Sequence, residues 1–218
     1  MMKLVVLGAS GGCGRLLVTQ AAARGHTVTA VARASSRLDV PSGVRALRGA
    51  LDDEGFLREA VRGADAVLSA LGLRLPGIAP WSRPEDPGFL DRSTPAVVRA
   101  MKAEGVGRAV VISAGGVADS YEEMPAAFKM FIRGSALRHV YPALERMEKT
   151  WRESGLDVCI ARPTGLTDEP ATGRARVVAR VEGRATIPRA DVAAWMLDAL
   201  AAPRFEARTP LLTVTGAA

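Results

Sequence analysis

The sequence predicts an α/β fold, in which helices cover both faces of a doubly wound, mostly parallel sheet. Short apolar runs alternate with helical stretches along the 218-residue chain, and a glycine-rich turn joins the first run to the first helix. The composition, 48% hydrophobic and 24% charged, supplies a sizeable core without disulfide bonds. We therefore expect one domain over residues 1–218.

The first part of the chain alternates strands with helices. Strands are expected where apolar or β-branched runs are too short for a helix, at residues 3–7, 27–32, 44–47 and 66–70. The first helix, 12–24, carries apolar residues at helical spacing and is followed by Gly25, a common residue just after a helix. The second, 52–62, has acidic residues in its first turn and ends at Gly63.

The same alternation continues to the end of the chain. Helices are expected at 94–104, with Pro95 in the first turn, within 137–154 and at 189–201. Strands are expected at 108–113, 156–161, 174–181 and 210–214. The strand at 174–181 alternates polar and apolar residues, as an exposed strand does.

Two long segments do not fit this regular alternation. Residues 73–91 contain four prolines, and residues 114–141 contain Pro125 and an apolar cluster at 128–132. Loops of this length in a compact domain usually serve function. Both follow the carboxyl ends of strands, where open α/β sheets bind ligands. We expect two lid-like insertions, at about 73–91 and 114–141, that cover the active site.

The cysteine, histidine and apolar patterns exclude several classes of protein. Cys13 and Cys159 are too few for a disulfide framework, which favours a reducing compartment. No run approaches 18 apolar residues, and the apolar start before Gly8 is too short for a signal peptide. The two histidines and two cysteines are widely separated, so we expect no metal site. A cytoplasmic protein is the expectation.

The chain is basic, with a formal net charge of +6, and arginine supplies 25 of its 29 basic residues. The codon bias of a GC-rich genome and a preference for phosphates or other anions both account for this composition. Nucleic-acid binding would require clustered charge with exposed aromatic residues. Here the arginines are spread along the chain and aromatic residues make up 5%, so no nucleic-acid partner is expected.

The most informative segment is the glycine loop, residues 8–14, directly after the first strand. Gly8 allows a sharp turn, Gly11 leaves the backbone bare where a pyrophosphate approaches, and Gly14 lets the helix pack on the strand. The helix N-terminus offers free N–H groups to phosphates. The loop, which also contains Ser10, Gly12 and Cys13, therefore predicts a Rossmann-like dinucleotide site. Cys13 is interpreted as a small residue tolerated beside the phosphates.

The residues after the second strand predict which dinucleotide binds. A site for NAD usually has an acidic residue there that accepts from the ribose 2′-hydroxyl. This chain has Arg33 and Arg37 with two serines between them, and no acid before Asp39. Guanidinium and hydroxyl groups would bind a 2′-phosphate through charge-assisted hydrogen bonds. We therefore expect NADPH (NADP) as the cofactor.

Several motifs occur in a characteristic order along nearly the whole chain: Gly8 to Gly14, Val31-Ala32-Arg33, Arg146-Met147-Glu148-Lys149, Ser154-Gly155-Leu156-Asp157, Arg162-Pro163-Thr164-Gly165-Leu166-Thr167-Asp168 and Ala171-Thr172-Gly173. In these motifs the sequence resembles the atypical short-chain dehydrogenases/reductases of the NAD(P)H-binding family, the flavin reductase/biliverdin-IXβ reductase-like group. The resemblance implies a Rossmann fold, NADPH binding and hydride transfer to flavins or similar conjugated acceptors. Other relatives resemble NmrA-type proteins, which bind the dinucleotide and regulate.

The resemblance also implies a set of cofactor-lining residues: Gly8, Ser10, Gly11, Gly12, Cys13, Gly14, Arg33, Arg37, Leu71, Gly72, Leu73, Ser113 and Pro163. This chain departs from the family in two places. Residues 49–51 read Gly-Ala-Leu where relatives often have Gly-Asp near the adenine. Gly165 stands where flavin reductase-like members carry a histidine.

The familiar proton-donating dyad of short-chain dehydrogenases, Tyr-x-x-x-Lys, is missing. Tyr121 is followed four residues later by Pro125, and Tyr141 by Glu145. Reduction of a flavin does not need the dyad, because solvent or a weak donor can supply the proton. Ser113 is the candidate for a polar contact near the nicotinamide, and Tyr141 the candidate proton donor.

The sequence therefore predicts an NADPH-dependent reductase whose partner is a small-molecule electron acceptor, flat and conjugated, such as a flavin, quinone or tetrapyrrole. FMN or FAD would be a substrate rather than a resident cofactor. The alternative is a non-catalytic NADP(H)-binding regulator of the NmrA type. No membrane partner is expected, and the chain is expected to be a monomer or a homodimer.

Overall fold

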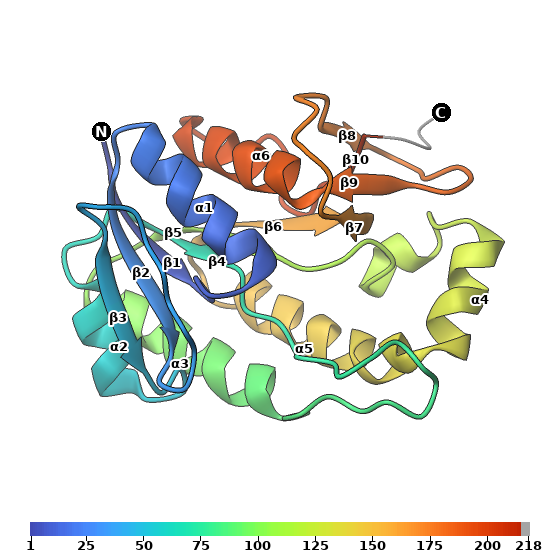
Figure 1. Cartoon of the computed structure of the whole chain (residues 1–218), viewed down its shortest axis with the longest axis horizontal. Helices are drawn as coiled ribbons and strands as arrows, with labels where there is room; N and C mark the ends of the chain where they lie inside the picture. The colour runs from blue at the N-terminus through green and yellow to red at the C-terminus, as the bar shows by residue number, and fades with distance from the viewer. Residues whose placement is uncertain (215–218) are drawn as a thin grey trace.

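An eight-stranded sheet runs through the protein with helices on both faces (Figure 1); this computed structural model describes residues 1–214. The strand order is β3-β2-β1-β4-β5-β6-β10-β8, and all neighbours are parallel except β8 and β10. The strands are β1 Lys3–Leu7, β2 Thr27–Arg33, β3 Arg45–Gly49, β4 Ala66–Ser69, β5 Arg108–Ile112, β6 Asp157–Pro163, β8 Arg176–Val178 and β10 Leu211–Thr213. The predicted doubly wound, mostly parallel sheet is confirmed.

Six helices flank this sheet within the described residues. They are α1 Gly12–Ala23, α2 Glu54–Val61, α3 Phe89–Ala103, α4 Ala126–Gly134, α5 Tyr141–Arg152 and α6 Arg189–Ala201. Helices α1 and α6 pack together over one face, and α2, α3 and α5 cover the other. β7 Gly165–Thr167 and β9 Thr186–Pro188 form a small parallel pair beside the main sheet, which the sequence interpretation missed. Every described helix is too short or too polar to span a bilayer.

The strand order reverses between β1 and β4, because β2 and β3 lie on one side of β1 and β4 to β6 on the other. At such a switch point the loops leaving the two central strands diverge and open a crevice at their carboxyl ends. The glycine loop follows β1 at this edge, and residues 70–88 leave β4 beside it. The topology therefore places both predicted binding segments at one opening.

Helix α3 and the first insertion differ from expectation. The helix begins at Phe89, five residues before the expected start, so Pro95 lies inside it. The extra turn forms because Leu90 and Ser93 are fully buried against the core, which offsets the hydrogen bond that proline cannot donate. The first insertion therefore ends at Gly88.

The prediction that residues 114–141 form an irregular segment is wrong. Helix α4 and two 3₁₀ turns, Ala118–Tyr121 and Ala136–His139, form within residues 114–141. Phe128 and Ile132, one helical turn apart, pack inward, whereas Met130 is 73% exposed. The helix expected within 137–154 is the shorter α5, Tyr141–Arg152, because Ala136–His139 before it forms a 3₁₀ turn.

Residues from three of the late sequence motifs hold the fold together. The Arg162 guanidinium in β6 donates to both Glu148 carboxylate oxygens in α5, at 3.0 and 2.6 Å, and both side chains are buried. The Asp191 carboxylate in α6 accepts from the Thr172 and Gly173 N–H groups at 2.8–3.0 Å, which ties the loop after β7 to the start of α6. These motif residues act on structure rather than on ligand.

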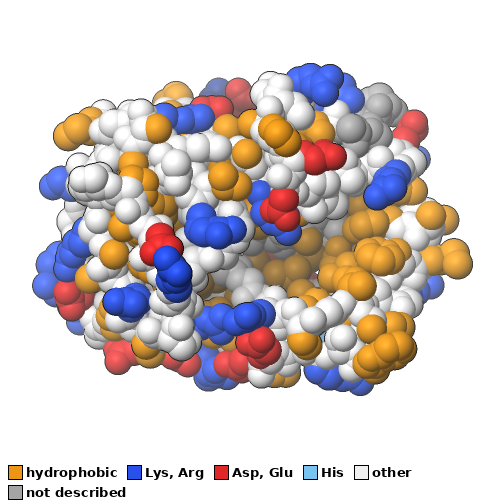
Figure 2. Space-filling view, viewed as in Figure 1, with side chains coloured by type: hydrophobic (Ala, Val, Ile, Leu, Met, Phe, Trp, Pro, Cys, Tyr) orange, Lys and Arg blue, Asp and Glu red, His pale blue; other side chains and the backbone are white. Residues whose placement is uncertain are grey.

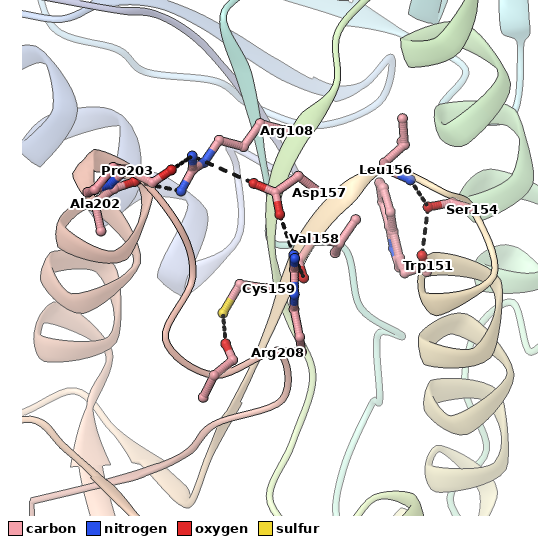
Figure 3. A network of polar contacts seen from close by, with 11 residues as sticks. Arg108, Trp151, Ser154, Leu156, Asp157, Val158, Cys159, Ala202, Pro203 and Arg208 are labelled. Carbon is pink, nitrogen blue, oxygen red and sulfur yellow. Dashed lines mark hydrogen bonds and ion pairs between the residues drawn. The ribbon is translucent and has the colours of Figure 1, made fainter.

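The opposite edge of the sheet, at the amino ends of β5 and β6, is closed by polar contacts (Figure 3). The Arg108 guanidinium donates to the carbonyls of Ala202 at 2.7 Å and Pro203 at 3.1 Å, just after α6. Asp157 forms ion pairs with Arg108, at 3.6 Å, and with Arg208. Charges gathered at a helix end in this way satisfy its last carbonyls, so this edge serves the fold.

Candidate functional site

A cleft of about 660 Å³ opens at the carboxyl ends of β1, β2 and β4, where the strand order reverses. It is lined by Gly8, Ser10, Gly11, Arg33, Ser35, Ser36, Arg37, Leu51, Ala70, Leu71, Gly72, Leu73, Arg74, Glu85 and Phe89. Eight of the residues predicted to line a cofactor therefore share one cavity. Gly12, Cys13, Gly14, Ser113 and Pro163 lie outside this lining.

The glycine loop has the geometry that its spacing predicts. Gly8 has φ +76°, and a Cβ there would lie 2.6 Å from the Ala70 carbonyl oxygen. A Cβ on Gly14 would lie 2.1 Å from the Gly8 carbonyl oxygen, so only glycine lets α1 approach the turn. A Cβ on Gly11 would meet nothing closer than 3.3 Å. Gly11 therefore leaves open the space where bare backbone can meet a phosphate.

Cys13 lies in the first turn of α1 and is buried. Burial raises the pKa of its thiol to about 11, the largest influence, while the nearby Arg189 guanidinium lowers it and Asp168 raises it. The thiol is therefore neutral at physiological pH and packs as a small apolar side chain. The expectation of a tolerated small residue agrees with this geometry.

Arg33 lies at the end of β2 and faces the cleft. Within residues 1–214 its guanidinium makes no hydrogen bond or ion pair, so its N–H donors are available to a ligand. Its charge acts on the Asp86 carboxylate, whose pKa is lowered mainly by the Arg92 hydrogen bond and to a smaller extent by Arg33. Arg37 also lines the cleft but pairs with the exposed Asp39 at 2.9 Å. The hydroxyls of Ser35 and Ser36 lie between them on the same wall. Charge-assisted binding of an anion at this wall rests first on Arg33.

The segment after β4 forms the opposite wall of the cleft. Leu71, Gly72 and Leu73 line it, as the resemblance implies. Arg74 and Glu85, which the sequence interpretation missed, also line it and form an ion pair at 3.2 Å that closes the base of the first insertion. Arg74 directly follows the predicted Leu71-Gly72-Leu73 segment, and this position could have indicated that it lines the cleft.

Leu51 also lines the cleft and is buried. Together with Phe89, it offers an apolar wall to a flat ring at this end of the cleft.

Ser113 follows β5 at the carboxyl edge of the sheet. Its N–H donates to the Ala161 carbonyl at 2.8 Å, which fixes the residue against β6. The side chain is 6% exposed, and its Oγ has no hydrogen-bond partner within residues 1–214. Buried hydroxyls are usually paired, so this hydroxyl is an exception, and Ser113 lines neither the cleft nor the neighbouring cavities.

Two other predicted site residues, Tyr141 and Pro163, lie away from the cleft. The Tyr141 hydroxyl donates to the Gly115 carbonyl at 2.9 Å, and burial raises its pKa above the ordinary value. Tyr141 lines a separate cavity of about 380 Å³ beside the second insertion. Pro163 is buried in β6, where its carbonyl accepts from the Gly115 N–H at 2.8 Å. Neither residue lines the 660 Å³ cleft.

The two insertions lie side by side and extend the site beyond this cleft. The Ala136 N–H in the second donates to the Ile78 carbonyl in the first at 3.0 Å, and Arg138 donates to the Pro80 carbonyl at 2.9 Å. Figure 2 shows a hollow in the middle of this face, with hydrophobic side chains on its floor and along the side formed by α4. The insertions thus border an apolar depression next to the charged cleft.

These residues fit a dinucleotide. The glycine cradle leaves backbone N–H groups at the N-terminus of α1, which favours a pyrophosphate. Arg33 offers positive charge at one end of the cleft, and Leu51 and Phe89 offer an apolar wall to a ring. The lining thus matches a ligand with separated phosphate and ring groups.

Comparison with known proteins agrees with this geometry. The chain is 27% identical over 226 residues to the UPF0659 protein YMR090W of Saccharomyces cerevisiae, covering 99% of this chain and 94% of that protein. Two solved structures share the fold. ChuY, an anaerobilin reductase of Escherichia coli O157:H7, has a TM-score of 0.77 and 24% identity over 96% of each chain. A short-chain dehydrogenase/reductase of Veillonella parvula in complex with NADP has a TM-score of 0.78 and 18% identity over 97% of this chain and 94% of that one.

The predicted Rossmann-like fold is confirmed by these neighbours. A family model described as NAD(P)H-binding matches residues 8–203, nearly the whole chain. The protein therefore belongs to the NAD(P)H-binding family, whose fold binds a nicotinamide cofactor and is shared by reductases.

Proposed function

We propose that this protein is an NADPH-dependent reductase of a flat, conjugated acceptor. The observation that carries the cofactor choice is the unpaired Arg33 guanidinium in the same cleft as the glycine loop. An acidic residue at this position would repel a 2′-phosphate, whereas a guanidinium binds it in a bidentate manner. Ser35 and Ser36 supply additional donors on the same wall.

The chain's own contribution to the reaction is binding, orientation and exclusion of water. When bound, the reduced nicotinamide supplies the hydride. Ser113 is proposed to hold the nicotinamide end through its unsatisfied Oγ. Tyr141 is a poor proton donor as it stands, because its hydroxyl is committed to the Gly115 carbonyl and its pKa is raised by burial. We therefore assign the proton to solvent.

The apolar depression beside α4 supports a flat acceptor. Hydrophobic side chains line its floor and one side (Figure 2), and charged ones lie on its upper margin. A flavin, quinone or tetrapyrrole would place its ring system against such a surface. The structural likeness to ChuY, which its name describes as an anaerobilin reductase, is consistent with a tetrapyrrole-like acceptor.

The proposal is tested by measuring NADPH oxidation with FMN, FAD, quinones and biliverdin as acceptors. We expect turnover above background with at least one of these ring systems. Ser113→Ala should lower that turnover, whereas Ser42→Ala, on the exposed turn before β3, should not change it. Absence of turnover with every acceptor, despite tight NADPH binding, would remove the reductase assignment.

Arg33→Glu is expected to weaken NADPH binding and leave NADH binding nearly unchanged. The variant loses a charge-assisted contact worth roughly 1.5–3 kcal/mol, or about 10- to 100-fold in Kd. Isothermal titration calorimetry with both nucleotides measures this. Arg45→Glu serves as the matched control, because Arg45 is exposed on β3 and pairs with Glu59. Equal weakening of the two nucleotides by Arg33→Glu would exclude the 2′-phosphate contact.

A second candidate function is a non-catalytic NADP(H) sensor. It is favoured by the committed Tyr141 hydroxyl and by the exposed Met130 and Phe131 on α4, which a partner protein could cover. This function predicts NADP(H) binding without turnover of any acceptor. The same calorimetry and turnover measurements therefore separate the two candidates.

A further inference from the structure

Arg189, the first residue of α6, lies directly against the glycine loop. A Cβ on Gly12 would be 2.8 Å from the Arg189 Cδ and 2.9 Å from its Nε, so the side chain crosses Gly12 where any larger residue would displace it. Gly12 is the first residue of α1. The Arg189 guanidinium is therefore held beside the first residue of α1 and next to the glycine loop, although neither Gly12 nor Arg189 lines the 660 Å³ cleft.

The close approach of Arg189 to Gly12 is fixed by contacts between α1 and α6. The Gln20 side chain in α1 donates to the Ala190 carbonyl at 2.9 Å, next to Arg189. Arg24 and Asp198 form an ion pair at 2.6 Å at the far ends of the same helices. The Asp191 carboxylate anchors the preceding loop, as described above. The register of α6 against α1 is thus determined independently of Arg189.

The position is electrostatically unfavourable in the absence of an anion. A helix N-terminus carries a partial positive charge, and Arg189 lies at the N-termini of both α1 and α6, where cations destabilise. Its charge is met by Asp168 at 2.8 Å, but the Asp168 side chain is 87% exposed. Exposed ion pairs contribute little to stability, so support of the fold does not explain this arrangement.

We propose that Arg189 is the side-chain ligand of the cofactor pyrophosphate and that Asp168 is the counter-ion which the guanidinium exchanges for it. The inference rests on the proposed dinucleotide function and adds a residue that sequence motifs did not assign. Backbone N–H groups of the loop would bind the phosphates from one side, and the guanidinium from the other. It also explains Gly12, which the turn itself does not require.

The test compares nucleotides with and without a pyrophosphate. NADP⁺ contains the pyrophosphate and the 2′-phosphate, whereas adenosine 2′-monophosphate contains only the latter. For Arg189→Met we expect the Kd of NADP⁺ to rise roughly 10- to 100-fold, the effect of a lost charge-assisted contact, with the Kd of adenosine 2′-monophosphate within about twofold. Arg33→Glu should weaken both. Displacement calorimetry gives both constants.

Three further variants complete the test. Arg24→Met removes an ion pair between the same two helices about 18 Å from the loop and should leave both constants unchanged. Asp168→Asn removes the competing anion and should tighten NADP⁺ binding at low salt by about two- to fivefold. Gly12→Ala displaces the flexible Arg189 side chain, so it should reproduce the binding loss of Arg189→Met while the thermal midpoint stays close to that of the wild type.

Two results would overturn the inference and leave the proposal that the wild type binds NADP standing. One is an Arg189→Met variant that binds NADP⁺ within twofold of the wild type. The other is equal weakening of NADP⁺ and adenosine 2′-monophosphate, which would indicate a general loss of the site. If the folded wild type binds neither nucleotide, the cofactor proposal itself fails, and this inference fails with it. Asp168→Asn leaves the contact between Arg189 and Gly12 in place. If Arg189→Met folds poorly, the effect of Asp168→Asn on the Kd of NADP⁺ therefore tests the inference, and an unchanged Kd would contradict it.

Discussion

Gly14→Ala is expected to lose NADP⁺ binding by on the order of 100-fold and to unfold more easily than the wild type. The added Cβ would lie 2.1 Å from the Gly8 carbonyl oxygen, which is backbone and cannot rotate away. Helix α1 must therefore shift from the turn, at a cost of about 3 kcal/mol, the upper end of the range for overpacking. The same shift moves the N–H groups that would hold the pyrophosphate.

Urea denaturation and calorimetry measure the two effects on one preparation. Gly107→Ala is the matched control, because a Cβ there meets no atom within 4 Å and the backbone has an ordinary φ. The control should retain both its unfolding midpoint and its affinity. A Gly14→Ala protein that binds NADP⁺ like the wild type would show that the loop does not carry the phosphates.

Arg162→Met is expected to lower the free energy of unfolding by about 3–5 kcal/mol, because it leaves the Glu148 carboxylate buried without its partner. The Glu148 side chain is fully buried, and Arg162 supplies its two close hydrogen bonds, while Arg152 stays 3.9 Å away. The Asp119 carboxylate also loses the Arg162 hydrogen bond that holds its pKa below the usual range. Thermal and urea unfolding measure the change.

The double variant Arg162→Met/Glu148→Leu provides the internal control. Replacing both members of a buried ion pair by apolar groups often restores stability, whereas removing one does not. We therefore expect the double variant to recover most of the loss. If it remains as unstable as Arg162→Met alone, the cost lies in packing around β6 and α5 rather than in an uncompensated charge.

The strands and the phosphate loop could be predicted because their signals are local. The apolar run of four residues before Gly8 favours a buried strand, and the glycine spacing that follows it reflects a steric requirement within a single turn. Arg33 was predicted for a related reason, since it follows its strand directly. The observed β1, β2 and glycine-loop geometries agree with these expectations.

The structure differs from the sequence prediction where contacts between distant segments outweigh the local preference for a helix or loop. Pro95 predicted a helix start, but burial of Leu90 extends α3 by a turn before it. The apolar cluster in the second insertion gave no clear period, and α4 forms because Phe128 packs against a hydrophobic cluster that contains Val181 and Leu211, while Ile132 is buried. Local propensity is a weak guide once such tertiary packing decides.

The alternation of the main-sheet strands with helices, the glycine cradle and the cationic end of the second strand followed from the sequence alone, because each depends on neighbouring residues. Only the tertiary structure decided that Leu51 and Arg74 join the cleft, that Tyr141 turns to a backbone carbonyl, and that Arg189 crosses Gly12. Such contacts join segments far apart in the chain, and they exist only after the sheet has set its strand order and the helices have packed on its faces.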